Sequence, residues 1–289
     1  MEKFDNKVYK EMVRELLSDA FYLKNRSNRG KISTIRSYSE VIVRRILNIP
    51  QNEKITLGDK NIKRELAKIS NNNSLLLKAI NIICDDGGDY THTQVIESPS
   101  DELVQKIIDC LFDLYAYLLI AYFEKYTFGS NSKVLSAFST LPPIIRYKVL
   151  NYLYEIECDN IAIIDKLVLS ILKSFDKETA LIWLEKRKDE LVNMSSISKE
   201  TREMYMNIGD ERILSFTEMN MYDLCLMKVN SVGKTIERYG KPYEDFEEAI
   251  DVYRENGIIA EEGLGIEEFN SIMEFIYLGR KSKLQMGNN

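Results

Sequence analysis

Residues 98–123 read SPSDELVQKIIDCLFDLYAYLLIAYF, and this stretch indicates the fold class. Ser98 and Pro99 suit the N-cap and first helical position, and Asp101 puts negative charge in the first turn, which the helix dipole favours. Apolar side chains then recur at three- and four-residue intervals, as a packed helix requires: Leu103, Ile107, Leu111, Leu114, Leu118 and Tyr122. We predict a long core or dimer-interface helix that ends near Phe128.

The most apolar part of this stretch is too short to span a membrane. It covers 13 residues, 111–123, and includes Asp113 and three tyrosines, whereas a span needs about 20 apolar residues. The chain begins Met-Glu-Lys-Phe-Asp, without an apolar signal segment. We expect a cytoplasmic protein that does not bind a membrane.

Composition points to helices throughout. Of 289 residues, 45% are hydrophobic and 29% charged, with 13 Gly and 5 Pro. So many apolar residues exclude a mainly disordered chain, and so few turn formers argue against a β-sandwich. The chain has four cysteines, Cys84, Cys110, Cys158 and Cys225. None of them forms a Cys-x-x-Cys pair, which argues against a zinc ribbon or a disulfide scaffold. We therefore predict an all-α fold.

Two helical regions follow from the hydrophobic spacing. We expect helices over residues 4–24, from Ser33 or Thr34 to Pro50, over 56–69, and over 75–83, followed by the long helix. The segment Gly129-Ser130-Asn131-Ser132 is the best linker, so we place a helical bundle at 1–128 and a C-terminal helical domain at 133–289. The second region has four predicted helices of similar length, which suggests stacked helical hairpins: 141–156, 160–174, 177–191 and 199–229. Two more helices are predicted over 242–255 and 266–281.

The chain has one histidine, His92, which follows a pair of glycines. Ser74 is the predicted cap of the helix at 75–83, and Gly87-Gly88 is its predicted stop. In the connection that follows, His92 could act as a general base near neutral pH, or it could simply cap or pack.

Oxygen donors near His92 could hold a divalent metal together with its imidazole, but their spacing does not fit a known metal-binding loop. Asp85, Asp86, Asp89 and His92 lie within eight residues, but they lack the alternating spacing of an EF-hand loop. The chain also lacks a Gly-Lys-Ser/Thr phosphate loop, a Gly-x-Ser-x-Gly elbow and a His-Glu-x-x-His helix. We expect no metal and no cofactor.

Charge is unevenly distributed along the chain. The net charge is −6, yet residues 1–70 hold 16 Lys and Arg against 9 Asp and Glu, and residues 237–268 hold 11 acids and 3 bases. The N-terminal bases could bind phosphates, with Tyr22 and Tyr38 for stacking, or could form a solvated helix face in which Arg36 pairs with Glu40. The candidate RNA-binding residues are Lys24, Arg26, Arg29, Lys31, Arg36, Arg44 and Arg45.

The order of features in residues 30–128 resembles the HEPN superfamily. The quoted features are Ile35-Arg36-Ser-Tyr-Ser-Glu40, then Ile55-Thr-Leu57-Gly, then Gly87-Gly-Asp-Tyr-Thr-His92, then the long apolar helix. They are most similar to the bacterial branch with a Gly-Asn-x-x-x-His-type motif, found in abortive-infection and toxin-like proteins.

The resemblance implies an up-and-down bundle that forms a homodimer around a polar cleft. In nuclease members this cleft cuts RNA without a metal, using an Arg followed four to six residues later by His. His92 takes the histidine position and Asp89 the displaced polar position, but Gly88, Gly87 and Asp86 stand where Arg is expected. A replacement cation would have to come from a neighbouring helix, for which Arg36, Arg44 and Arg45 are the candidates.

Two hypotheses follow. The first is a HEPN-like, RNA-binding protein in phage defence or RNA metabolism, with a weak or lost metal-independent endoribonuclease activity and His92 and Asp89 as candidate catalytic residues. The alternative is a non-enzymatic homodimeric scaffold that recruits a protein partner through its acidic C-terminal helices.

Overall fold

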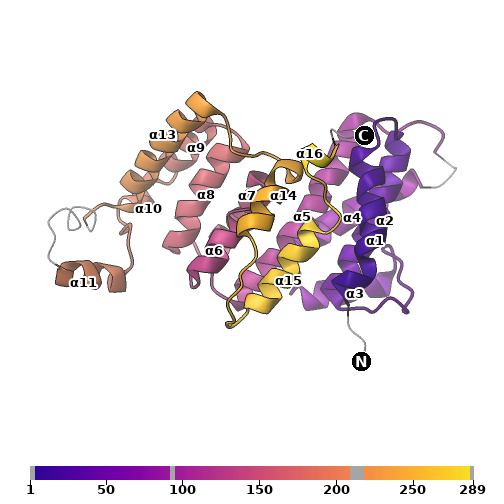
Figure 1. Cartoon of the computed structure of the whole chain (residues 1–289), viewed down its shortest axis with the longest axis horizontal. Helices are drawn as coiled ribbons and strands as arrows, with labels where there is room; N and C mark the ends of the chain where they lie inside the picture. The colour runs from indigo at the N-terminus through magenta and orange to yellow at the C-terminus, as the bar shows by residue number, and fades with distance from the viewer. Residues whose placement is uncertain (1–3, 92–94, 209–217, 287–289) are drawn as a thin grey trace. The chain divides into compact units, whose positions relative to one another are not determined.

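The computed structural model describes residues 4–91, 95–208 and 218–286 (Figure 1). Over these residues the backbone forms helices, turns and an isolated bridge between Ser195 and Asn220, and no strand, which confirms the all-α prediction. The chain packs as two compact units: unit 1 comprises residues 1–126 and 246–289, and unit 2 comprises residues 127–245.

This division differs from the predicted one in the last part of the chain. The chain passes from unit 1 to unit 2 between residues 126 and 127, beside the predicted linker. It returns to unit 1 between residues 245 and 246, a boundary that the predicted domain at 133–289 does not contain. The helices after it return to unit 1, where Phe246 contacts Phe112 and Tyr115, and Phe269 contacts Tyr122.

Unit 1 is built around one central helix. Its elements are α1 (Asn6–Leu17), the π-helical turn η1 (Ser18–Tyr22), α2 (Asn28–Leu47), α3 (Lys60–Ile69), α4 (Ser74–Asp89), α5 (Asp101–Lys125), α14 (Phe246–Asn256), α15 (Ile266–Tyr277) and α16 (Lys283–Met286). The central α5 packs against α2, α4 and α15 (Figure 1), and Leu111, Tyr115 and Leu119 on it are fully buried. It is the long helix of the sequence analysis, although Ser100 caps it rather than Ser98.

The glycine pair does not end α4, so that prediction was wrong. The helix is capped by Asn73, whose Oδ1 accepts from Leu76 N at 3.0 Å, and it continues through Gly87 and Gly88 to Asp89. A Cβ on Gly88 would lie 2.7 Å from Nη1 of Arg36. The missing side chain therefore lets α2 place a guanidinium against α4.

The start of α2 also differs from the prediction. Ser27, rather than Ser33 or Thr34, caps this helix by accepting from Gly30 N at 3.2 Å. The predicted connection is therefore helical from Asn28. As a result, Arg29 and Lys31 lie in the first turn of α2.

Unit 2 has its core between two consecutive helices. Its elements are α6 (Ser132–Phe138), α7 (Pro143–Ile156), α8 (Ile161–Ser174), α9 (Lys177–Glu185), α10 (Lys188–Leu191), α11 (Lys199–Ile208) and α13 (Met221–Tyr239). Helices α7 and α8 pack along each other and bury Val149, Leu153 and Leu167, while α9 and α13 pack on α8. The predicted helix 177–191 is two helices, and the predicted helix 199–229 includes residues 209–217, which lie outside the described residues.

A buried arginine fastens the C-terminal segment into unit 1. The side chain of Arg280 is 2% exposed, and its guanidinium lies 4.2 Å from the ring centroid of Phe246. Nη2 donates to the hydroxyl of Tyr115 at 3.3 Å, and Nη1 pairs with Glu247 at 3.4 Å. The hydroxyl of Tyr22 donates to the same carboxylate at 2.9 Å, so one ion pair joins η1, α5 and α14.

The residue before this arginine must be glycine. Gly279 has φ +76°, and a Cβ there would lie 2.9 Å from the backbone N and Cα of Arg14 on α1. Both the left-handed conformation and the close approach of two backbones exclude a side chain.

We expect Gly279→Ala to lower the free energy of unfolding by about 1–3 kcal/mol, the usual cost of a strained backbone conformation. The matched control in unit 1 is Gly58→Ala, since nothing lies within 4 Å of that Cβ and no positive φ is present. Urea denaturation followed by circular dichroism measures both. Equal midpoints for the two variants would contradict the packing described.

Candidate nucleic-acid interface

Two of the predicted RNA-binding residues, Arg44 and Arg45, bind acceptors of the protein itself. Arg44 donates to the carbonyl oxygens of Pro50 at 2.9 Å and Glu53 at 2.7 Å. Arg45 donates to Oδ1 of Asn6 at 2.6 Å, and burial lowers its pKa to about 10. These guanidiniums hold the chain after α2 and the start of α1.

Arg29 holds the chain on both sides of the histidine. Nη1 donates to the carbonyl of Tyr90 at 2.9 Å, and Nη2 donates to those of Val95 at 2.7 Å and Glu97 at 2.9 Å. The predicted catalytic residue His92 stands between these acceptors in the sequence and lies outside the described residues. Arg29 therefore anchors Tyr90 and residues 95–97 to the N-terminal turn of α2.

Arg36 supplies a guanidinium beside the end of α4. Its Nη1 donates to the carbonyl of Cys84 at 3.3 Å and lies over Gly88. Gly88 is four residues before His92 in the sequence. A guanidinium from α2 therefore lies against the end of α4.

The carboxylates of this region are separate from one another. Asp85 pairs with Lys63 at 3.7 Å and Asp86 with Lys106 at 2.6 Å, while Asp89, the second predicted catalytic residue, is exposed in the last turn of α4. Among the described residues, no group of three or more His, Cys, Asp or Glu side chains could hold a metal ion.

The other three predicted bases lie at the start of α2. Arg26 pairs with Asp19 at 3.3 Å and donates to Oγ1 of Thr34 at 3.3 Å. Lys24 is exposed before the helix, and Lys31 is partly exposed in its first turn. Of the seven candidate bases, Lys24 is the exposed one, and the other six, Lys31 among them, are partly buried.

The two tyrosines expected to stack on bases have other roles. Tyr38 is 1% exposed, and its hydroxyl accepts from that of Tyr115 at 2.7 Å. Tyr22 donates to Glu247, and burial raises its pKa to about 12. The prediction that they are available for stacking was wrong, because both belong to the hydrogen-bond network of the unit 1 core.

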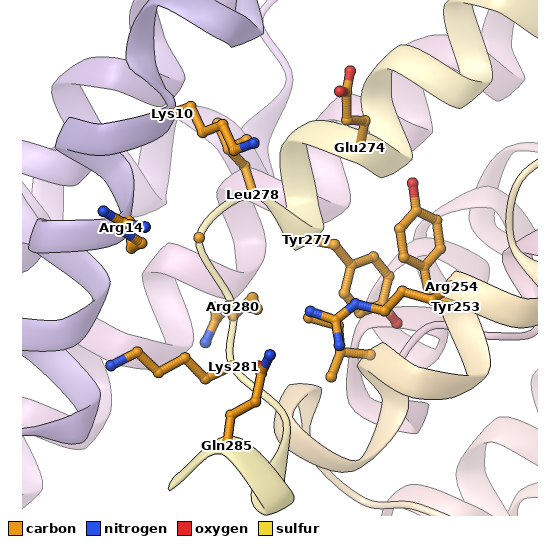
Figure 2. A pocket seen from close by; sticks show the side chains of 12 residues that line it. Lys10, Arg14, Tyr253, Arg254, Glu274, Tyr277, Leu278, Arg280, Lys281 and Gln285 are labelled. Carbon is orange, nitrogen blue, oxygen red and sulfur yellow. The ribbon is translucent and has the colours of Figure 1, made fainter. Parts of the chain in front are cut away.

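A basic cavity that the sequence analysis missed lies elsewhere in unit 1 (Figure 2). It has a volume of about 550 Å³, and five cationic side chains line it. Lys10 and Arg14 extend from α1, Arg254 from α14, and Arg280 and Lys281 from the segment after α15. We call this the unit 1 cavity.

The charge of the unit 1 cavity is only partly compensated. Glu274 supplies one carboxylate to the lining, and the buried Arg280 is already paired with Glu247. Arg14 pairs with Glu11, and Arg254 pairs with Asp251 at 2.9 Å. Such exposed pairs contribute about 0–1 kcal/mol each, so an incoming phosphate can compete with them.

Two stacked tyrosines form an aromatic wall of the unit 1 cavity. The ring centroids of Tyr253 and Tyr277 are 4.1 Å apart and the ring planes differ by 7°. Burial raises the pKa of Tyr253 to about 12, so its phenol stays neutral at physiological pH. The two rings are 8% and 5% exposed and stack on each other, so they shape the wall of the cavity and do not offer a free face to a base.

The acidic stretch proposed as a partner surface also forms internal pairs in unit 1. Glu247 pairs with Arg280, Glu248 with Lys283, and Glu268 with Lys125 at 2.6 Å. These contacts use the acids to hold the last helices in place.

The sequence matches no protein-family model, and neither the curated proteins nor the solved structures give a significant match. In the described part of the chain, no helix combines the length and apolar character that a membrane span requires. The proposed function therefore rests on the sequence and on the positions of the side chains described above.

We expect Arg29→Ala to increase hydrogen exchange at the amides of residues 95–97 and to lower stability by about 1–3 kcal/mol, because hydrogen bonds from a charged donor contribute about that much. The control is Arg64→Ala, since Arg64 is exposed and donates within its own helix to Asn61. Exchange mass spectrometry measures both. Unchanged exchange in the Arg29 variant would show that this arginine does not anchor the segment.

Proposed function

We propose that the protein is a HEPN-like, RNA-binding protein whose unit 1 cavity holds the phosphate backbone of single-stranded RNA. The observation that supports the proposal is the convergence of Lys10, Arg14, Arg254 and Lys281, from three segments of the chain, on one cavity whose fifth cation, Arg280, is held by its buried ion pair with Glu247. Phosphate contacts supply much of the affinity of proteins for nucleic acid, and cations placed by a rigid fold also set its path.

The size and exposure of the cavity support a strand as ligand. About 550 Å³ falls within the range of sites for small organic ligands, so one nucleotide fits. Lys10, Arg14 and Arg254 are exposed and can meet neighbouring phosphates, whereas Arg280 is buried. The exposed cations would contribute the salt-dependent part of binding.

A second candidate function is slow cleavage of the bound RNA without a metal. It rests on Arg36, which lies over Gly88 beside the segment that carries His92. In this proposal His92 is the general base, Asp89 assists, and Arg36 stabilises the negative charge that develops on the phosphate. The HEPN resemblance adds a homodimer and a role in phage defence or RNA metabolism in the cytoplasm.

The scaffold alternative draws on the acidic C-terminal stretch as a surface for a protein partner. The ion pairs of Glu247, Glu248 and Glu268 engage part of that stretch within unit 1. These three acids are therefore engaged inside unit 1, which reduces the acidic surface left for a protein partner.

We expect the double variant Lys10→Gln/Arg14→Gln to weaken binding of single-stranded RNA about tenfold at low salt. We also expect the slope of log K against log salt to fall by about 1–2, because each lost phosphate contact removes part of the counterion release. Filter binding over a salt series measures both quantities.

The matched control is Lys60→Gln/Arg64→Gln, which removes the same residue types at the same spacing from the exposed face of α3. Equal losses in both variants would show that only net charge matters. A larger loss in Lys24→Glu/Lys31→Glu would place RNA on the start of α2 and contradict the cavity.

In EDTA we expect the wild type to cut mixed cellular RNA slowly. We expect Arg36→Gln and His92→Ala to cut it at least tenfold more slowly, since each removes a group needed for the chemistry, and to bind it normally. Denaturing gels follow the cleavage, with Arg64→Gln as control. RNA left intact by the wild type, or cut equally by His92→Ala, would refute the nuclease proposal and leave RNA binding untouched.

A further inference from the structure

Unit 2 has a second cationic cavity, which the proposed function does not use. Its volume is about 220 Å³, and Arg146 of α7 and Lys166 and Lys173 of α8 line it. Among its described lining residues there is no carboxylate. We call it the unit 2 cavity.

Helix geometry explains why these groups meet. Lys166, Ser170 and Lys173 follow one another at four- and three-residue intervals and so share one face of α8. Arg146 and Leu150 share a face of α7 in the same way, and the two helices pack along each other. The cationic side chains of both helices therefore reach one enclosed space.

A tyrosine closes the cavity from a third segment. The hydroxyl of Tyr243 donates to the carbonyl of Ser139, and the guanidinium of Arg146 lies 5.7 Å from the centroid of the Tyr243 ring. Arg146 is only 7% exposed. Two fixed contacts thus hold this arginine and the tyrosine at the wall of the cavity.

The cationic side chains of the unit 2 cavity act on one another. Burial, with the nearby charges of Arg146 and Lys166, lowers the pKa of Lys173 to about 8. Cations that approach one another away from water repel strongly unless an anion lies between them. The fold thus brings three cationic side chains to one lining that contains no carboxylate, and the oxygens of a small anion could contact all three.

The volume limits the size of that anion. About 220 Å³ is below the roughly 300 Å³ at which pockets for drug-sized ligands begin, and corresponds to about seven water molecules at about 30 Å³ each. A nucleotide is too large, but a tetrahedral oxyanion with a few waters fits. Guanidinium and ammonium donors are also the usual ligands of phosphate oxygens.

We propose that the unit 2 cavity binds a single tetrahedral oxyanion, either free phosphate or the phosphoryl group of a small phosphomonoester, through Arg146, Lys166 and Lys173. The anion would stabilise unit 2, because a ligand that binds only the folded state shifts the unfolding equilibrium. This site is independent of RNA binding in unit 1.

The test uses the full chain and thermal unfolding at pH 7 in inorganic phosphate, sulfate and glycerol phosphate, each compared with chloride at equal ionic strength. We expect phosphate and sulfate to raise the melting temperature by several degrees relative to chloride. A comparable rise in glycerol phosphate would assign the site to phosphomonoesters, and a rise in the inorganic anions alone would assign it to free phosphate.

Lys173→Met keeps the apolar stem of the side chain but removes its charge. We expect it to melt higher than the wild type in chloride, since the repulsion is relieved, and to lose at least tenfold in phosphate affinity by calorimetry. Lys166→Gln is a second variant with the same expected loss. Lys186→Met, at an exposed position outside the cavity, is the control and keeps wild-type binding.

The proposal is overturned if phosphate and sulfate stabilise the wild type no more than chloride does. It is also overturned if Lys173→Met and Lys166→Gln both bind phosphate as tightly as the Lys186→Met control. Both results are independent of RNA binding, which depends on unit 1.

Discussion

The ion pair between Arg280 and Glu247 is the contact on which the architecture of unit 1 depends. It is buried, and it also engages the hydroxyls of Tyr22 and Tyr115, so that the last helices are joined to η1 and α5. Removing one partner of a buried pair typically costs about 3–5 kcal/mol, because the other charge remains without compensation. The same contact brings Arg254 and Lys281 to the cavity that Lys10 and Arg14 line from α1.

Arginine serves structure more than binding in the N-terminal quarter of the chain. Arg29 and Arg44 donate to main-chain carbonyls, and Arg45 donates to Asn6. A guanidinium can satisfy several acceptors at once, so a basic stretch of sequence can be consumed by the fold itself. The density of bases along the sequence is therefore a poor guide to where the protein meets an anion.

Local sequence patterns predicted most of the helices. Which side chains meet in space depends instead on tertiary contacts. The spacing of Leu111 and Leu114 was enough to predict α5. Because glycine is a poor helix former, Gly87-Gly88 predicts the end of a helix, but Arg36 packs over Gly88 and the helix continues. Nothing in local spacing indicates that residue 10 and residue 281 line one cavity, since that depends on where the last helices pack.

Photocrosslinking tests the central claim most directly, namely that the unit 1 cavity holds RNA. Single-stranded RNA containing 4-thiouridine would be irradiated with the full protein, and the crosslinked peptides identified by mass spectrometry. The account predicts crosslinks in residues 4–17 and in residues 250–286, which together line the cavity. Crosslinks confined to residues 24–45 or to unit 2 would contradict it.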